Sequence, residues 1–240
     1  MRKAYAVNRE HSAPLARTQY QDKNEKAQKL TKNTEALHQM FEKNLWSREG
    51  VEIPFLFRQT ADHRLQEFSA LQIPIHQWAD SDPARQMKVQ AMQSVVNGLN
   101  NLHAHDIVHR DIKPANMVID TQQKTPQGKL IDWDTWRSTN SGERIYVCGT
   151  PGYLGPEKVG LTNDSLKPMD VFALGVSLYE IFEPEELVMR EEDVYTPKIS
   201  IKKQGVGKNS LAHLIWDMTR SDPAQRPTMA QVALRFKTIS

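Results

Sequence analysis

The sequence predicts an α+β fold, with strands concentrated in the first 72 residues and mainly helices after them. Apolar residues recur at steps of three and four from Met87 to Leu102, which is the spacing of an amphipathic helix. A polar loop then leads into the apolar residues 117–119, as a functional loop often leads into a buried strand. Short segments with the alternation of strands are found earlier, at residues 4–8, 53–57 and 65–71.

Composition places the chain among ordinary soluble globular proteins. It has 240 residues, of which 39% are hydrophobic and 25% charged, and its formal net charge is +2. So small a charge gives no reason to expect binding to nucleic acid or to a membrane surface. No apolar run is long enough to span a membrane, and the N-terminus lacks the apolar core of a signal peptide.

The number of cysteines predicts the cellular compartment of the protein. The single cysteine, Cys148, cannot form a disulfide within the chain, so we expect a reducing, cytoplasmic environment. We interpret Cys148 as a small half-buried residue and not as a redox switch. A bacterial effector that is exported without a signal peptide and acts in a host cytosol is an alternative that fits the compact size.

Several further segments have helix signals. Residues 21–46 are rich in Lys, Gln, Glu, Ala and Leu and contain neither Pro nor Gly, which favours a helix. Asp82 before Pro83 signals the start of the helix that contains Met87. Residues 183–200 are acidic and then irregular, so no regular element is predicted there. Apolar runs predict other helices at residues 171–182, 211–218 and 229–236, the last capped by Thr228.

Residues 109–117 carry the strongest chemical signal in the chain, His-Arg-Asp-Ile-Lys-Pro-Ala-Asn-Met. Asp111 can accept or orient the proton of an attacking hydroxyl. Lys113 can neutralise charge on a transferring phosphoryl group, and Asn116 offers an amide oxygen to Mg²⁺. This segment resembles the catalytic loop of the protein kinase family, and residues 109–117 are called the catalytic loop below.

Other segments resemble the same family in the same order. Asp132, in Leu-Ile-Asp-Trp-Asp at residues 130–134, stands where the metal-binding Asp-Phe-Gly of the family begins. Residues 149–157, called the substrate loop below, resemble the segment that ends the activation loop and holds a peptide substrate. Residues 170–175 resemble the start of the central buried helix, and residues 222–227 the Arg-containing turn near the C-terminus.

The resemblance implies a two-lobed protein-kinase-like fold in one domain over residues 1–240. A reduced small lobe would occupy residues 1–72 and a mainly helical large lobe residues 73–240. The implied activity is transfer of the γ-phosphate of ATP to a protein hydroxyl. Asp111 would be the base, Lys113 would contact the phosphates, and Asp132 with Asn116 would hold Mg²⁺ or Mn²⁺.

The substrate class also follows from the resemblance. Lys113 together with Gly149 and Thr150 of the substrate loop is the combination found in serine/threonine kinases. A small-molecule kinase of related fold would lack a peptide-positioning loop of this kind. The expected partner is therefore a protein substrate, whose identity the sequence does not specify.

Supporting roles are implied for residues around the catalytic loop. Glu157 and Arg226 are expected to form an internal ion pair, and Asp170 to cap the loop backbone. His109 is expected to brace the loop by packing, without taking part in the chemistry. His103 is interpreted as a helix-end residue.

Arg110 next to Asp111 resembles kinases whose activation loop is ordered by phosphorylation, because an arginine there is paired by a phosphate. The candidate acceptors in the polar segment that follows Asp134 are Ser138, Thr139 and Ser141. An unmodified, solvated loop is an equal alternative.

The sequence also departs from the family. Asn8 stands in the place of the phosphate-binding lysine if residues 4–8 are its strand, and no glycine precedes it to form a phosphate loop. Glu35 or Glu42 is the expected partner of that lysine, ahead of Glu25, and for each of them a solvated surface position is an equal alternative. Glu67 lies in the expected adenine-binding hinge. Asp134 replaces a glycine, which is unfavourable if the backbone there needs a positive φ.

Two classes of function therefore stay open. One is an active serine/threonine kinase in which another cation such as Lys3, or metal, compensates for Asn8. The other is a pseudokinase, a binding module that holds nucleotide or a partner without transferring phosphate. The presence of Asp111 and its partners favours the enzyme, since a scaffold has no need of the full set. A third alternative is a chain that has been trimmed at its N-terminus or changed at Asn8.

Overall fold

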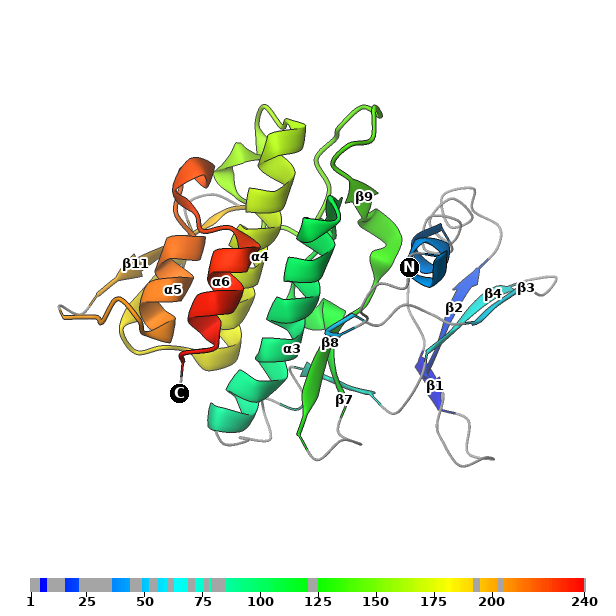
Figure 1. The fold of residues 1–240 in the computed structure, drawn as a ribbon, viewed down its shortest axis with the longest axis horizontal. Coiled ribbons are helices and arrows are strands. Elements are labelled where there is room, and N and C mark those ends of the chain that lie inside the picture. The colour runs from blue at the N-terminus through cyan, green and yellow to red at the C-terminus, as the bar shows by residue number, and fades with distance from the viewer. Residues whose placement is uncertain are drawn as a thin grey trace.

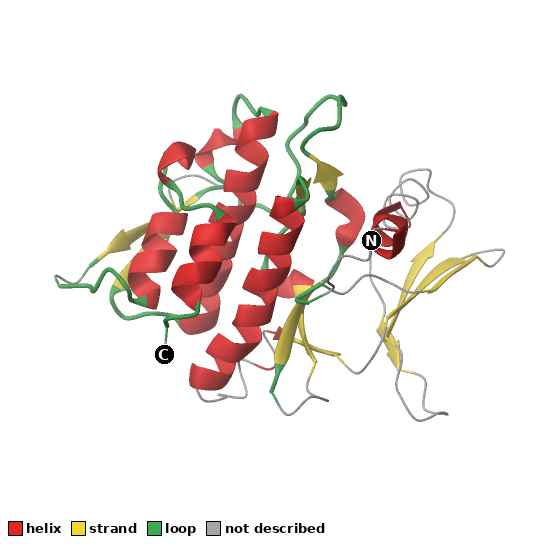
Figure 2. Ribbon diagram, in the orientation of Figure 1, coloured by secondary structure: helices red, strands yellow, loops and turns green. Residues whose placement is uncertain are grey.

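The computed structural model has a strand-rich part, to which the first described strands belong, and a larger helical part, as Figures 1 and 2 show. The predicted α+β class is confirmed. The domain boundary predicted at residue 72 stays a prediction. The structure describes residues 5–7, 16–21, 36–43, 49–51, 56–59, 63–68, 72–75, 78, 85–120, 125–191, 195–202 and 205–239.

The strand-rich part holds an antiparallel sheet with the strand order β1-β2-β4-β3 (Figure 1). The strands predicted at residues 4–8, 53–57 and 65–71 are found with shifted bounds as β1, β3 and β4. The sequence does not predict β2, and the helix prediction is wrong at Gln21, the last residue of that strand. β2 pairs with β1 on one side and with β4 on the other. These strand pairings stabilise β2 although its sequence, which contains two Gln, has little preference for a strand. The strands are β1 Tyr5–Val7, β2 Ala16–Gln21, β3 Leu56–Gln59 and β4 His63–Phe68.

A helix is described at residues 36–43, inside the predicted segment. Leu37 and Phe41, one turn apart, are 0% and 2% exposed and join the main core, while Glu42 is exposed. Among the described strands, β2 is the one that directly precedes this helix. The assignment of residues 4–8 to the strand that carries the phosphate-binding lysine stays a prediction.

Helices α3, α4, α5 and α6 form the larger part (Figure 2). On α3 the predicted face is buried at Ala91, Val95 and Leu99, but Met87 is 39% exposed because the buried face begins at Val89. None of the described helices is both long and apolar enough to cross a membrane. The bounds are α3 Arg85–Ala104, α4 Asn163–Phe182, α5 Leu211–Met218 and α6 Met229–Phe236.

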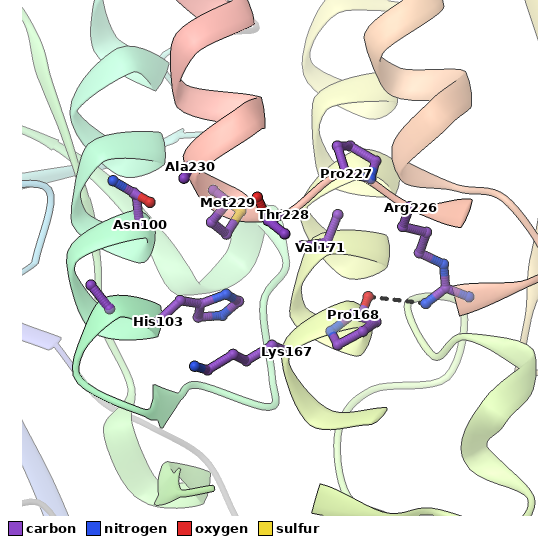
Figure 3. Close-up of a pocket in the computed structure, with 11 residues that line it drawn as sticks. Asn100, His103, Lys167, Pro168, Val171, Arg226, Pro227, Thr228, Met229 and Ala230 are labelled. Carbon is purple, nitrogen blue, oxygen red and sulfur yellow. Dashed lines mark hydrogen bonds between the residues drawn. The ribbon is translucent and has the colours of Figure 1, made fainter. Parts of the chain in front are cut away.

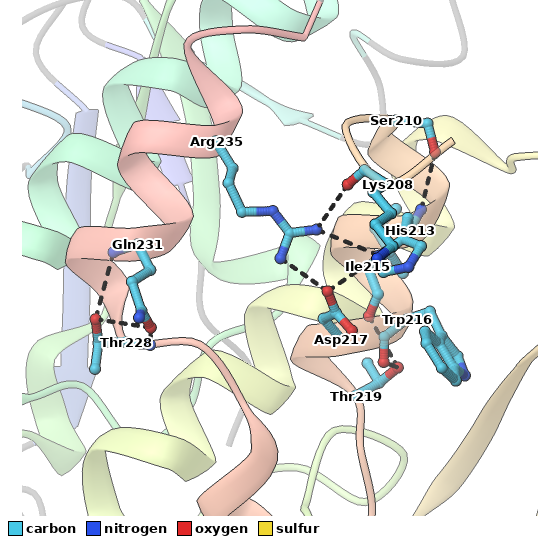
Figure 4. Close-up of polar contacts among 10 residues, drawn as sticks. All are labelled: Lys208, Ser210, His213, Ile215, Trp216, Asp217, Thr219, Thr228, Gln231 and Arg235. Carbon is cyan, nitrogen blue, oxygen red and sulfur yellow. Dashed lines mark hydrogen bonds and ion pairs between the residues drawn. The ribbon is translucent and has the colours of Figure 1, made fainter. Parts of the chain in front are cut away.

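Helices α5 and α6 are joined by a polar group that Figure 4 shows. Arg235 of α6 donates to Asp217 of α5 at 2.8 Å, and His213 lies 3.1 Å from the same carboxylate oxygen. The predicted cap at Thr228 is confirmed, because its hydroxyl accepts from Gln231 N while the Gln231 side chain accepts from Thr228 N.

A second sheet lies against α3 and delivers the catalytic loop. It has the order β5-β7-β8, with β5 Gln72–Pro74, β7 Met117–Asp120 and β8 Gln127–Leu130. Gly128 of β8 approaches α3 so closely that a Cβ there would lie 2.6 Å from Ala91 O. β6 Ile107–Val108 pairs with β9 Arg137–Ser138, so both sides of the loop are anchored to strands.

The segment after α4 forms a two-stranded antiparallel hairpin, β10 Leu187–Glu191 with β11 Pro197–Ile201. The prediction of an irregular segment is therefore wrong. Ile199 is 4% exposed, and β11 packs on α5. Alternating apolar residues in β11 were the available signal, but the preceding acidic residues obscured it.

Candidate active site

Asp111, Lys113 and Thr150 form one hydrogen-bonded group. Lys113 Nζ donates to Asp111 Oδ2 at 2.8 Å and to Thr150 Oγ1 at 2.5 Å. Thr150 Oγ1 donates in turn to Asp111 Oδ1 at 2.6 Å. The catalytic loop and the substrate loop therefore meet at the Asp111 carboxylate.

Asn116 completes this group from the short 3₁₀ helix η1, Pro114–Asn116. Its Nδ2 donates to Asp111 O at 2.8 Å and to Asp111 Oδ2 at 3.0 Å, and the residue is 4% exposed. Pro114 at the first position of η1 fixes the backbone that carries it. Because the amide nitrogen is directed at Asp111, the amide oxygen faces the opposite side and can serve as a ligand.

The electrostatics of the group keep Asp111 ionised. Burial raises the pKa of the Asp111 carboxyl, but the hydrogen bonds from Lys113 and Thr150 outweigh burial and hold the pKa below its usual value. At neutral pH the side chain is a carboxylate, which can accept a proton or orient a hydroxyl donor.

Asp132 lies beside the end of the catalytic loop, since Ile131 N donates to Asn116 O at 3.0 Å. Its φ of 69° and ψ of 66° are in the left-handed region, which Asp tolerates better than most residues. Asp134 lies inside the 3₁₀ helix η2, Trp133–Thr135, and does not have a positive φ. The concern about replacing glycine at Asp134 is therefore wrong, because the backbone needs its left-handed residue at Asp132 instead.

His109 connects the catalytic loop to the Asp132 segment. The side chain is 0% exposed, its ring lies 4.5 Å from that of Trp133, and Nε2 lies 3.0 Å from Ile131 O. A carbonyl oxygen only accepts, so Nε2 carries the proton and Nδ1 accepts from Asp111 N at 3.3 Å. The imidazole thus braces the loop and does not reach the Asp111 carboxylate with a donor.

Asp170 of α4 holds the backbone on the other side. Its carboxylate, 1% exposed, accepts from His109 N and from Arg110 N, each at 2.8 Å. Arg110 has a φ of 71°, and these bonds offset the roughly 1–2 kcal/mol that a left-handed residue costs. His103 Nε2 also lies 3.1 Å from Asp170, a contact that no local signal in the sequence could indicate.

Glu157 and Arg226 form a two-pronged ion pair. Arg226 Nη1 donates to Glu157 Oε1 at 2.5 Å and Nη2 to Oε2 at 2.8 Å, with the side chains 0% and 8% exposed. Arg226 also donates to Pro168 O at 2.9 Å, as Figure 3 shows. The pair joins the end of the substrate loop to α4, and Arg226 also lines a cavity of about 280 Å³ between α3, α4 and α6 (Figure 3).

Two arginines hold the activation segment, defined here as residues 137–148. Arg137, 6% exposed, donates to Glu143 O at 3.0 Å and more weakly to Ser141 O and Arg144 O. Arg110 Nη2 donates to Tyr146 O at 2.8 Å. Sequence reasoning missed Arg137, because a bond to a main-chain carbonyl requires no particular partner residue.

The candidate phosphate acceptors lie within this held segment. Ser141 Oγ accepts from Arg137 Nη2 at 2.5 Å, and Ser138 Oγ accepts from Asn140 N at 3.2 Å. Thr139 N donates to Asp106 O at 2.8 Å. The segment is thus held by hydrogen bonds that its carbonyl and hydroxyl oxygens accept. Phosphorylation of these residues stays a prediction.

Gly149 and Cys148 lie where the activation segment meets the substrate loop. Gly149 has a φ of 121°, and a Cβ there would lie 2.9 Å from Arg110 O, so only glycine fits. Burial raises the pKa of the Cys148 thiol, which keeps it protonated and poorly nucleophilic at neutral pH. This agrees with a packing role for Cys148.

Only some of the residues predicted for the small lobe are among the described residues. Asn8, Lys3 and Glu35 lie outside the described residues. Glu67 lies in β4, where its backbone is opposite Arg17 of β2. Among the described residues, the side chains that meet around Asp111 all lie after residue 72.

Comparison with known proteins identifies the relatives of this chain. Residues 69–235 match the family model described as Protein kinase domain. The chain is 30% identical over 140 residues to the serine/threonine-protein kinase PSK2 of Saccharomyces cerevisiae, a match covering 58% of this chain and 12% of that protein. It is 29% identical over 154 residues to the phosphorylase b kinase gamma catalytic chain, liver/testis isoform, of Mus musculus, covering 58% and 37%.

A third relative is a probable serine/threonine-protein kinase 2 of Plasmodium falciparum, 34% identical over 96 residues, with 40% of this chain and 19% of that protein covered. The chain thus spans at most 37% of the length of these relatives. The shared region includes the helical part, where the hydrogen-bonded group around Asp111 lies.

Proposed function

Because this chain belongs to the protein kinase family, we propose that it is a serine/threonine protein kinase that transfers the γ-phosphate of ATP to a protein hydroxyl. The observation that carries the proposal is the hydrogen-bonded group of Asp111, Lys113 and Thr150. It brings an ionised acceptor, a cation and the substrate loop to one point. Two of the three relatives are named as serine/threonine-protein kinases, which supports the same acceptor class.

Each side chain has a distinct task in this proposal. The Asp111 carboxylate accepts a hydrogen bond from the substrate hydroxyl, orients its oxygen toward the γ-phosphate and receives its proton. Lys113 lies 2.8 Å from that carboxylate and neutralises charge that develops on the phosphoryl group. Thr150 ties both residues to the substrate loop, so a bound peptide and the reacting carboxylate are positioned together.

Mg²⁺ or Mn²⁺ would be held by Asp132 and Asn116, and it would neutralise the nucleotide phosphates. A carboxylate and an amide oxygen suit these hard cations, and the Ile131–Asn116 backbone bond keeps the two residues adjacent. Within the described residues no group of three or more His, Cys, Asp or Glu could hold a metal alone. The nucleotide phosphates would therefore have to supply further ligands.

The place of the phosphate-binding lysine stays predicted at Asn8, and Lys3 is the cation proposed to compensate for it. Lys3→Ala should then collapse the transfer rate at saturating Mg²⁺-ATP, because a charge-assisted contact to the phosphates is lost. A rise in rate with Asn8→Lys would instead indicate a kinase that is weakened at that position.

The pseudokinase is the second candidate. It is favoured by the composition of residues 1–49, which contain no glycine and so cannot themselves form a Gly-rich phosphate loop. Such a protein would bind nucleotide or a partner through the same large-lobe group without transferring phosphate.

Transfer of radiolabelled phosphate from ATP to generic protein substrates separates the two candidates. Native protein should label serine or threonine, and Asp111→Asn should lose about 10²- to 10⁴-fold in rate while circular dichroism shows that it remains folded. Asp164→Asn, which changes an exposed aspartate at the start of α4, is the matched control and should keep the native rate. Nucleotide binding without any labelling would favour the pseudokinase.

A further inference from the structure

The β10–β11 hairpin is attached to the substrate loop at two points. Gly152 N donates to Tyr195 O at 2.8 Å, and Lys158 Nζ, just past the loop, donates to Thr196 Oγ1 at 2.6 Å. Thr196 is 3% exposed and Lys158 is half-buried, so the second bond is partly shielded from water. Tyr195 and Thr196, which directly precede β11, therefore hold the middle of the substrate loop and the residue that follows the loop.

The attachment lies close to the reacting group. Tyr153 N donates to Thr150 O at 3.1 Å, and Pro151 followed by Gly152 with a φ of 89° matches a type II turn. The four residues of such a turn span less than about 7 Å, roughly two residues of extended chain. Thr150, which bonds to Asp111, thus lies within about two extended residues of the point where Tyr195 contacts the loop.

Tyr195 presents an apolar surface at this point. It is 47% exposed, and Lys158 Nζ lies 5.7 Å from the centre of its ring. Val159, the residue after Lys158, is 81% exposed. An aromatic ring has few rotatable bonds, so it offers a large contact area at little cost in conformational entropy.

We propose that Tyr195 is a specificity-determining residue, which contacts an apolar substrate side chain within about two positions of the acceptor hydroxyl. The inference rests on the proposed function, because the acceptor position is defined by Asp111 and Thr150. It goes beyond that function by assigning substrate selection to a hairpin after α4, outside the catalytic and substrate loops. The occupant is an extended segment of the substrate protein, since that segment continues from the hydroxyl at Asp111.

Peptides that differ at one position test the assignment. A serine is placed in a Gly- and Ala-rich peptide, and leucine is introduced singly at each of the two positions on either side. For native protein, leucine at one of these positions should lower the peptide KM about three- to tenfold. Tyr195→Ala should abolish that preference while kcat and the KM for ATP stay unchanged, and Tyr195→Phe, which keeps the ring, should preserve it.

Fluorescence anisotropy with the same labelled peptides gives a readout that does not need phosphoryl transfer. Native protein and Tyr195→Phe should bind the leucine peptide about three- to tenfold more tightly than the parent peptide, and Tyr195→Ala should bind both alike. Thr196→Val, which removes the bond from Lys158, should weaken the same preference. Absence of any leucine preference in native protein, or its survival in Tyr195→Ala, would overturn the inference. Loss of transfer with an intact binding preference would instead contradict the proposed function alone.

Discussion

The catalytic loop and the activation segment are held by different kinds of contact. In the catalytic loop, buried side chains of defined type hold the backbone, as Asp170 does at 1% exposure. In the activation segment, Arg137 and Arg110 bind main-chain carbonyls of residues that are themselves exposed, such as Tyr146 at 62%. In both arrangements one end of the bond is a main-chain group, so the difference lies in burial: the Asp170 carboxylate is enclosed, whereas the arginines bind carbonyls of exposed residues.

This difference also determines how easily each of the two segments opens. A buried carboxylate that loses its partners leaves an unpaired charge, so the catalytic loop cannot open without a large loss of free energy. A carbonyl that loses its arginine can bond to water, so the activation segment can open locally at small cost. The predictions below probe each side of this contrast.

The largest effect is expected at the buried ion pair. Arg226→Met leaves the Glu157 carboxylate uncompensated, and should lower the free energy of unfolding by about 3–5 kcal/mol. Arg235→Met is the matched control, because its pair with Asp217 is 28% and 23% exposed and should contribute at most about 1 kcal/mol. Urea denaturation measures the free energy of unfolding of both variants. Equal losses would show that burial does not determine how much each ion pair stabilises the protein.

Arg137→Met should act locally. The variant removes the donor to the carbonyls of Ser141 and Glu143 and should destabilise the segment by about 2 kcal/mol without unfolding the protein. Hydrogen exchange should rise in residues 138–147 and stay at the native level in α4. Faster exchange throughout the large lobe would contradict the contrast, because it would make Arg137 part of the cooperative core.

Acid should weaken the catalytic loop through Asp111. The folded pKa of this carboxyl lies below its unfolded value of about 3.9, so its stabilising contribution is complete above about pH 5 and is lost as the pH falls through the folded pKa. Lys113→Met removes a group that lowers this pKa. Urea denaturation between pH 7 and pH 3 should therefore show a shallower loss of stability for Lys113→Met than for native protein, and identical slopes would contradict the assignment.

The smallest effect is expected at Ser141. Its hydroxyl accepts from Arg137, but the arginine keeps its carbonyl partners when the hydroxyl is removed. Ser141→Ala should therefore change stability by less than about 1 kcal/mol and leave phosphoryl transfer at the native rate. A large fall in transfer would mean that phosphorylation of Ser141, and not the arginines, orders the segment.

Sequence alone determined the elements and site groups whose signals are local. Helices α5 and α6 were predicted with their exact bounds, since helical periodicity and the Thr228 cap are properties of neighbouring residues. The residue types at Asp111, Lys113 and Asn116 likewise indicated a phosphoryl-transfer site before any contact was known. The structure then brought these three together around one carboxylate.

Only the tertiary structure decided the features that depend on distant partners. β2 exists because β1 and β4 pair with it, and the β10–β11 hairpin is placed by its contact with α5. His103 lies in the last turn of α3 as predicted, but its contact with Asp170 depends on the packing of another helix. Arg137 gave no signal at all, because its partners are carbonyl groups that every residue carries. A strand or a polar contact of this kind is specified by the group opposite it, and that group becomes known only when the chain has folded.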